Sequence, residues 1–181
     1  FYRKFYHSGR TMVHIDGSRG EGGGQVLRTS LALSILSGSP VRIENIRAGR
    51  KKPGLMAQHL KAVEAAAAIS GALVEGAVSG GTTLVFKPQG LFPGRYFFDI
   101  GTAGSTSLVL QTILVPLSFA KASSRLIVRG GTHVPWSPSF QYLESHLSQF
   151  LRKIGFDLDL ELEGAGYYPR GGGRIRAVVR P

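Results

Sequence analysis

The feature that most constrains this chain is an internal repeat. Its two halves show the same order of expected elements: strand, loop, helix, strand, loop, helix and two final strands. Arg28 falls opposite Gln111, an offset of 83 residues (111 − 28), and Gly71 falls opposite Gly155, an offset of 84 (155 − 71). Because a nearly constant offset relates unrelated residue types, the pattern indicates two duplicated βαβαββ modules and an α+β fold.

Hydrophobic spacing and the start and stop signals of helices divide the chain into modules at residues 12–90 and 91–181. In the first module, strands are expected at 12–15, 41–46, 72–76 and 82–87, and helices at 25–37 and 55–70. In the second module, strands are expected at 96–100, 125–128, 156–161 and 173–179, and helices at 107–120 and 140–154.

A glycine-rich loop occupies residues 16–28, with five glycines among thirteen residues between the first strand and the first helix. Backbone N–H groups at such a helix start suit phosphate. The loop is not a P-loop, because no lysine follows the glycines, and it is not G-x-G-x-x-G, because Gln25 holds the last position. It carries one carboxylate, Glu21, and Arg28 follows one turn into the helix, which suggests a site for phosphate with a metal or a proton.

A basic loop, residues 46–55, is the second candidate site. Four cations fall within six residues and precede a helix start: Arg47, Arg50, Lys51 and Lys52. Guanidinium groups and helix-end amides can bind the same phosphate. The alternative is an exposed basic loop without a specific ligand. His59 lies just inside the following helix, and a structural role is expected for it, as for the other four histidines, because none has the spacing of a zinc site or a nucleophile.

The equivalent loop of the second module, residues 129–140, combines paired glycines, prolines and aromatic residues. Trp136 and Phe140 could form a shelf on which bases stack, or could equally be core residues. In the preceding helix, Gln111 is the only long polar side chain among apolar residues. We expect its amide to be buried and hydrogen-bonded, because an unsatisfied amide there costs roughly 1–3 kcal/mol.

The charge balance favours an anionic partner. Lys and Arg total 22 against 11 acidic residues, a net charge of +11, which points first to nucleic acid and second to phosphorylated small molecules, although a solvated basic surface is the alternative. The absence of cysteine excludes disulfides and thiolate metal sites. The longest apolar run, residues 108–120, has the length of a buried helix rather than a membrane span, so no membrane partner is expected.

Six motifs in this order resemble the N-terminal half of the RNA 3′-terminal phosphate cyclase family. They are residues 21–28 (EGGGQVLR), 46–50 (IRAGR), 53–60 (PGLMAQHL), 104–111, 130–132 (GGT) and 166–173 (GYYPRGGG). The resemblance implies a fold of repeated βαβαββ modules like the C-terminal domain of translation initiation factor 3, shared with enolpyruvyl transferases.

The resemblance implies an ATP-dependent enzyme of the ligase class that acts on RNA ending in a 3′-phosphate. In this family ATP adenylylates a histidine, AMP passes to the RNA 3′-phosphate, and the neighbouring 2′-hydroxyl attacks to leave a 2′,3′-cyclic phosphate. Arg28, Arg47 and Arg50 would then neutralise and align the phosphates. Glu21 would bind a divalent metal, Mg²⁺ or Mn²⁺, or position an attacking group.

Further roles follow from the same resemblance. Gln111 would point at the nucleotide phosphate, and Pro138 and Tyr142 would pack on the adenine of ATP. Gln58 and Lys52 would hold a phosphate of the substrate. A non-catalytic cyclase-like protein of ribosome biogenesis and an enolpyruvyl transferase-like enzyme are the alternatives. The first is expected to lack the Glu21 and arginine motifs, and the motifs of the second are absent.

The two ends carry expectations of their own. Residues 1–11 are interpreted as an extension before a native start at Met12, and the last strand ends just before Pro181. A third module, an inserted small domain and the nucleophilic histidine are expected beyond residue 181. No histidine of this chain matches that nucleophile, so the fragment alone is not expected to form an enzyme–AMP adduct. A homodimer and a cytoplasmic location complete the sequence-based predictions.

Overall fold

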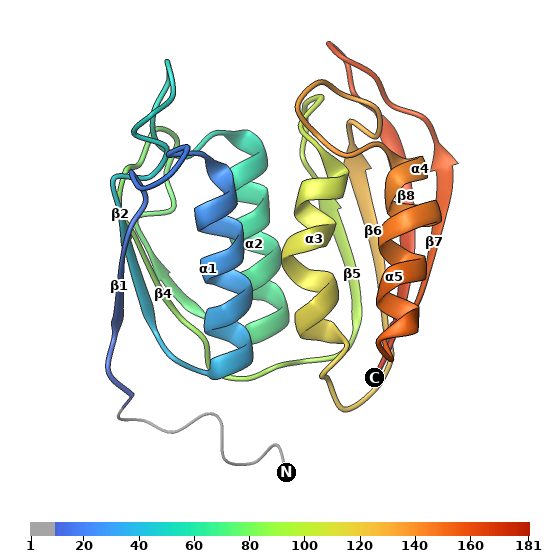
Figure 1. Cartoon of the computed structure of the whole chain (residues 1–181), viewed down its shortest axis with the longest axis horizontal. Coiled ribbons are helices and arrows are strands. Elements are labelled where there is room, and N and C mark those ends of the chain that lie inside the picture. Colours follow the sequence, from blue (N-terminus) through green and yellow to red (C-terminus); the bar gives the residue numbers. More distant parts are fainter. Residues whose placement is uncertain (1–9) are drawn as a thin grey trace. The chain divides into compact units, whose positions relative to one another are not determined.

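The computed structural model of the protein describes residues 10–181 (Figure 1). The proposed extension, residues 1–11, therefore lies outside the described residues except for its last two positions. The described residues form two compact units that divide between Phe92 and Pro93. Each unit combines a mixed four-stranded sheet with helices, which confirms the predicted α+β class.

The first unit contains β1 (Val13–Asp16), α1 (Gly24–Ser37), β2 (Val41–Glu44), α2 (Ala57–Ser70), β3 (Leu73–Glu75) and β4 (Leu84–Lys87). Its sheet has the order β1-β2-β4-β3. Strand β1 pairs with β2 in parallel, because α1 carries the chain back to the same end, and the remaining pairs are antiparallel.

The second unit contains β5 (Arg95–Asp99), α3 (Thr106–Leu117), β6 (Ser124–Gly130), α4 (Phe140–Tyr142), the π-helical turn η2 (Leu143–Leu147), α5 (Ser148–Lys153), β7 (Asp157–Gly164) and β8 (Gly173–Arg180). Its order, β5-β6-β8-β7, repeats that of the first sheet with the same parallel and antiparallel pairs. The duplicated topology matches the repeat in the sequence.

Helices cover one face of each sheet, and the apolar residues between them form the cores. In α1 the fully buried residues recur at helical spacing, as in Leu27, Leu31 and Ile35, and they meet strand residues such as Ile43 and Phe86 that point to the same layer. These layers fix the ends of the strands from which the glycine-rich and basic loops emerge.

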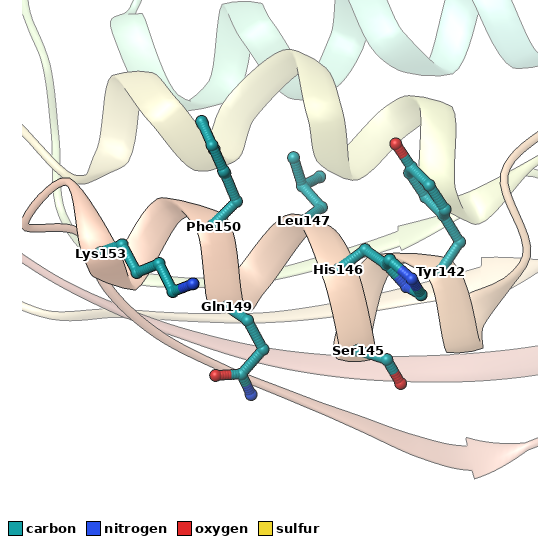
Figure 2. Close-up of a pocket in the computed structure, with 7 residues that line it drawn as sticks. All are labelled: Tyr142, Ser145, His146, Leu147, Gln149, Phe150 and Lys153. Carbon is teal, nitrogen blue, oxygen red and sulfur yellow. The ribbon is translucent and has the colours of Figure 1, made fainter.

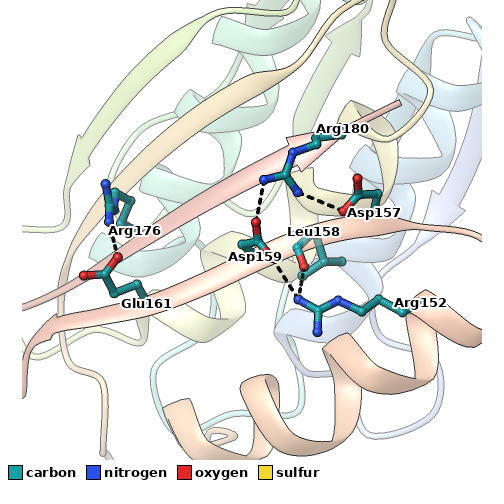
Figure 3. Close-up of polar contacts among 7 residues, drawn as sticks. All are labelled: Arg152, Asp157, Leu158, Asp159, Glu161, Arg176 and Arg180. Atoms are coloured by element: carbon teal, nitrogen blue, oxygen red, sulfur yellow. Dashed lines mark hydrogen bonds and ion pairs between the residues drawn. The ribbon is translucent and has the colours of Figure 1, made fainter.

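Charged residues alternate with buried ones on β7 and β8. Figure 3 shows Arg180 bonded to Asp157 (2.8 Å) and to Asp159 (2.5 Å), with Arg176 bonded to Glu161. Hydrogen bonding to Arg180 lowers the pKa of Asp159. Because these pairs are exposed, each contributes little to stability, but together they neutralise the basic charge on this part of the sheet.

Helix boundaries agree with the sequence-based expectation to within one residue except in three places. Helix α2 begins at Ala57 instead of residue 55, and α3 ends at Leu117 instead of residue 120. Pro116 lies in the last turn of α3, beyond which the Phe119 N–H bonds to the Pro116 carbonyl (3.0 Å) in the tighter i→i−3 pattern. The single helix expected at 140–154 contains η2 between α4 and α5.

Candidate functional site

The glycine-rich loop and the basic loop pack against each other through glycine. A Cβ atom added at Gly22 would lie 2.9 Å from the Gly49 nitrogen, and one added at Gly49 would lie 3.0 Å from the Glu21 carbonyl oxygen. Contacts this close leave no room for side chains. The glycines therefore allow the basic loop to approach the start of α1.

Two further glycines make room for cationic side chains at the start of α1. A Cβ at Gly23 would lie 2.8 Å from Arg50 Nη2. A Cβ at Gly24 would lie 2.5 Å from His59 Nε2 and 2.9 Å from Arg28 Nη1. We call Arg28, Arg47, Arg50 and His59 the arginine cluster. It brings together the two loops that the sequence analysis identified separately.

Arg28 is the most buried member of this cluster among the arginines, with only 7% of its surface exposed. Its Nη2 donates to Gln25 Oε1 (2.9 Å), whereas its buried Nε has no hydrogen-bond partner. Burial lowers the pKa of the guanidinium to about 10. Among the described residues no carboxylate pairs with it, so an anion is the missing partner that the geometry favours.

Arg47 and Arg50 are held by different contacts. Arg47 Nη1 donates to the carbonyl oxygens of Lys52 (2.9 Å) and Gly54 (2.7 Å), and burial, with the nearby Arg50 charge, lowers its pKa. Arg50 Nη2 lies 3.2 Å from Glu21 Oε2. The carboxylate of the glycine-rich loop thus contacts Arg50, and with a side chain 90% exposed it keeps its second oxygen accessible.

The two residues predicted to hold substrate phosphate lie beside the cluster. Lys52 is exposed, and its contact with Arg47 runs through its backbone carbonyl. Gln58 is half-buried in the first turn of α2. The described residues contain no group of three or more His, Asp or Glu side chains that could hold a metal ion by themselves, so Glu21 stands as a single carboxylate.

Another carboxylate, Asp16, ends β1 but has a structural role. It accepts hydrogen bonds from the Ser18 hydroxyl (2.7 Å), the Ser18 N–H (3.0 Å) and Asn45 Nδ2 (3.1 Å). These bonds lower the pKa of Asp16 to about 2. Its Oδ1 ties the glycine-rich loop to the end of β2, which leaves Glu21 as the more available carboxylate.

His59 belongs to the cluster, although the sequence analysis gave it only a structural role. It is buried, and its Nδ1 accepts the Met56 N–H (3.2 Å), which caps the start of α2. The proton of the neutral ring is therefore on Nε2, the atom facing Gly24. Burial, then the charges of Arg47 and Arg28, lowers the pKa to about 3. Its position just after a basic loop was the signal in the sequence.

The neutral state of His59 predicts a pH dependence of stability. The unfolded chain takes up a proton near pH 6.5, whereas the folded chain does so only near pH 3. The free energy of unfolding should therefore fall as pH decreases from 6.5, by up to about 1.4 kcal/mol per pH unit, and be constant above pH 7. Urea unfolding at a series of pH values between 4.5 and 7.5 measures this change in the free energy of unfolding.

His59→Asn is the control for that pH dependence, since an amide does not titrate in this range. The variant should lose most of the slope that the unmodified chain shows between pH 4.5 and 6.5. Equal slopes in the two proteins would contradict the buried neutral imidazole. The window stays above the pH at which Asp16 protonates in the folded chain.

In the second unit the equivalent loop is organised around His133. With its proton on Nε2, the ring donates to Gln141 Oε1 (2.6 Å) and accepts the Thr132 hydroxyl at Nδ1 (2.8 Å). Tyr167 stacks on the same ring, with centroids 5.3 Å apart. The Gly166 N–H also donates to Thr132 Oγ1 (2.9 Å), so two loops distant in sequence are joined.

The three residues predicted to bind the nucleotide lie in this second unit. Gln111 is half-buried on α3, and its amide bonds to no other described residue, so the expected burial and internal hydrogen bond are wrong. Its side chain is partly exposed, so the amide can be solvated. Pro138 is also half-buried, in the loop before α4.

Tyr142 is half-exposed and stacks on His146, with centroids 5.4 Å apart and planes 7° apart. Figure 2 shows both rings at one end of a surface depression of about 400 Å³ along α4, η2 and α5, with Phe150 and Lys153 toward the other end. The aromatic edges and the ammonium group suit a flat ligand that carries negative charge.

The two aromatic residues of the loop at 129–140 differ in burial. Phe140 is buried, as the core interpretation expected, whereas Trp136 is fully exposed and the core interpretation is wrong for it. Trp136 also adopts a left-handed backbone conformation (φ 63°), which directs the chain outward at this position. Sequence spacing alone could not separate the two residues, because each follows a turn residue.

Comparison with known proteins decides the family. The sequence pattern described as RNA 3′-terminal phosphate cyclase matches residues 19–181. The chain belongs to the RNA 3′-terminal phosphate cyclase family. The match includes the arginine cluster and both glycine-containing loops, so the resemblance drawn from the six motifs is confirmed.

Curated cyclases from archaea and bacteria show the same similarity. The chain is 54% identical over 170 residues to the RNA 3′-terminal phosphate cyclase of Archaeoglobus fulgidus, covering 94% of this chain and 52% of that protein. It is 53% identical over 164 residues to that of Hyperthermus butylicus, covering 91% and 46%. For Ralstonia nicotianae the values are 53% over 169 residues, 93% and 49%. The chain thus spans about half the length of the curated cyclases it matches.

Proposed function

We propose that this chain supplies the phosphate-binding half of an ATP-dependent enzyme, of the ligase class, that converts an RNA 3′-phosphate into a 2′,3′-cyclic phosphate. The observation that carries the proposal is Arg28, a buried guanidinium whose Nε lacks a partner. Arg47 and Arg50 lie in the same cluster, and His59 adds no charge to it. We expect such a cluster to bind a compact anion of high charge, such as phosphate, more strongly than it binds any side chain of this protein.

The reaction needs positive charge where phosphates meet. The 3′-phosphate receives AMP from the enzyme, and the 2′-hydroxyl oxygen then bonds to that phosphorus while the bond to AMP breaks and AMP leaves. Negative charge grows on the phosphoryl oxygens in both transfers, so fixed guanidinium groups lower the barrier. Arg47, anchored through two carbonyl oxygens, is pre-positioned for this role.

A divalent cation would use Glu21. Mg²⁺ is commonly held by one or two carboxylates together with substrate phosphate oxygens and water, and an exposed Glu21 fits that arrangement. The cation would supply charge neutralisation at the phosphates. Arg50 contacts one oxygen of Glu21 and leaves the other oxygen for the cation.

For ATP, we propose contacts from the second unit. Tyr142 and Pro138 would pack on the adenine, and Gln111, whose amide bonds to no other described residue, would donate to a phosphate oxygen. Gln58 and Lys52 would hold a phosphate of the RNA beside the arginine cluster. The partially exposed state of all these side chains is compatible with ligand contact.

Binding of the RNA end tests the proposal directly. A short RNA ending in a 3′-phosphate should bind at least tenfold more tightly than the same RNA with a 3′-hydroxyl, because charge-assisted hydrogen bonds to a terminal phosphate contribute about 1.5–3 kcal/mol each. Fluorescence anisotropy with 5′-labelled RNA measures both affinities. Arg50→Ala should remove most of the difference, whereas Arg42→Ala, which breaks only an exposed pair with Glu44, should keep it.

Equal affinities for the two RNA ends would contradict the proposal. Turnover can be measured in a chimera in which residues 19–181 replace the matching half of the Archaeoglobus fulgidus cyclase. With ATP and MgCl2, the labelled 3′-phosphate should become resistant to phosphatase. A folded chimera that binds ATP without producing this resistance would refute the assigned reaction.

Two sequence-based expectations stay predictions. A homodimer and a cytoplasmic location would both be compatible with this activity. Within residues 10–181, no helix has the length and apolar character needed to cross a membrane.

A further inference from the structure

One group of exposed aromatic side chains has no role in the proposed site. Trp136 is fully exposed, Tyr168 is 74% exposed and Tyr167 is 59% exposed. All three come from two loops of the second unit, residues 130–140 and 164–173, which reach the same end of that unit at the top of Figure 1. We call Trp136, Tyr167, Tyr168 and Arg170 the aromatic loop cluster.

The two loops are joined by contacts that do not involve the exposed faces. The Thr132 and His133 N–H groups both donate to the Gly166 carbonyl, at 2.9 and 3.1 Å. His133 stacks on Tyr167. Trp136 lies three residues after His133, and Tyr168 follows Tyr167 directly, so every aromatic member is within three residues of this junction. The cluster is therefore supported by a fixed base.

Burial cannot explain these aromatic side chains. A left-handed backbone conformation is unfavourable for a bulky residue, yet Trp136 adopts it and places its ring entirely in solvent. Phe140, four residues later, shows that the same loop can bury an aromatic ring. Large aromatic side chains exposed on two loops that are hydrogen-bonded to each other indicate a contact surface.

The positive charge of the aromatic loop cluster indicates the class of partner that it binds. Arg170 is exposed in the second loop, and it forms no ion pair with any residue among 10–181. Aromatic rings on which bases stack, together with a guanidinium that donates to phosphate, are the combination with which proteins bind single-stranded nucleic acid. An acidic protein partner would satisfy Arg170 but would leave the rings of Trp136 and Tyr168 without stacking partners.

We propose that the aromatic loop cluster binds single-stranded RNA by stacking bases on Trp136 and Tyr168, with Arg170 on the backbone phosphate. This inference rests on the proposed function, since it assigns the cluster to the same RNA. It adds a second contact that holds nucleotides other than the terminal phosphate. The interaction depends on unstacked bases and not on the chemistry of the 3′ end.

The chain contains a direct probe of this site, because Trp136 is its only tryptophan. A twelve-nucleotide single-stranded RNA should quench the fluorescence of Trp136 in the 181-residue chain, whereas the same RNA annealed into a blunt duplex should not. At saturating RNA, quenching should be equal for 3′-phosphate and 3′-hydroxyl ends. No quenching at RNA concentrations that saturate the anisotropy signal would overturn the inference.

Variants test the individual contacts by anisotropy. Trp136→Ala and Tyr168→Ala should each weaken RNA binding by between about 5-fold and 150-fold, and Trp136→Phe should restore most of the affinity. Arg170→Ala should reduce the slope of log affinity against log salt by about 1. Phe97→Ala and Arg125→Ala, exposed residues on the sheet of the same unit, should change neither quantity.

The outcomes separate this inference from the proposed function. Quenching without discrimination between the two RNA ends would support the aromatic loop cluster and contradict the cyclase site. Discrimination without quenching would do the reverse. If Trp136→Ala leaves RNA affinity unchanged but alters self-association in sedimentation velocity, the cluster is a protein interface and the inference is wrong.

Discussion

Replacing Arg28 with methionine is expected to remove phosphate binding and to make the fold more stable. The guanidinium is buried with one hydrogen bond to Gln25 and an unpartnered Nε, and burial lowers its pKa to about 10. Methionine keeps the long apolar stem without a charge to desolvate. Replacing buried charged groups by apolar ones of similar volume stabilises proteins by about 1–4 kcal/mol, so we expect about 1–2 kcal/mol here.

The loss of binding should be large. Two charge-assisted hydrogen bonds from Arg28 to a phosphate contribute at least about 3 kcal/mol, so the affinity for ATP or for a 3′-phosphate RNA should fall by at least about a hundredfold. Calorimetric titration measures the affinity, and urea unfolding at pH 7.5 measures the stability. Opposite signs of the two effects are the signature of a residue kept for binding.

A matched control separates this effect from a general loss of positive charge. Arg42 is exposed on β2 and is paired with Glu44, so Arg42→Met should change phosphate affinity by less than about threefold and stability by less than about 1 kcal/mol. If Arg28→Met instead destabilises the chain by several kcal/mol with unchanged phosphate affinity, Arg28 is a structural residue.

The fold could be predicted because its signals are local and repeated. Helix periodicity and glycine at helix ends are read from neighbouring residues, and the offset that relates Arg28 to Gln111 shows that the same pattern occurs twice. The parallel pairing of β1 with β2 and of β5 with β6 follows from the connections, since a helix between two strands returns the chain in parallel, whereas the place of β4 between β2 and β3 does not follow from them. Errors of two or three residues at the start of α2 and the end of α3 arose where Pro53 and Pro116 alter the turns.

The individual surroundings of the side chains could not be predicted in this way. His59 is neutral because it is buried and because the charges of Arg47 and Arg28 lie near it, and the glycine at position 24 leaves the space. Gln111 is half-buried and Trp136 is fully exposed, and the packing of the surrounding helices and strands determines both exposures. These properties depend on tertiary packing, for which a single sequence carries no local signal.

Among the glycine-to-alanine substitutions of the first unit, Gly54→Ala is expected to be the most destabilising. Gly54 has a left-handed conformation (φ 78°), and a Cβ there would overlap the carbonyl of Gly80. Backbone cannot move aside as a flexible side chain can, because Gly80 is itself held by its N–H bond to the Leu55 carbonyl (2.8 Å). Backbone strain and overpacking together predict a loss of about 3–5 kcal/mol in urea unfolding.

Gly80→Ala provides the matched control, since its φ of 76° is nearly the same but its Cβ would meet no atom within 4 Å. This variant should lose only about 1 kcal/mol, the cost of the conformation alone. Equal losses in the two variants would contradict the packing argument.

The Gly54→Ala substitution should also disturb the position of Arg47 in the arginine cluster and weaken phosphate binding. The Gly54 carbonyl accepts the 2.7 Å hydrogen bond that positions Arg47, and the Gly54 N–H bonds to the Ile46 carbonyl across the basic loop (2.8 Å). A shift of the backbone at Gly54 therefore moves Arg47 even in molecules that stay folded. Phosphate affinity measured below the unfolding transition should fall at least tenfold in Gly54→Ala and remain unchanged in Gly80→Ala. Stability and phosphate binding thus depend on the same glycine, because Gly54 lies in the basic loop, which packs against Gly80 and also orients Arg47.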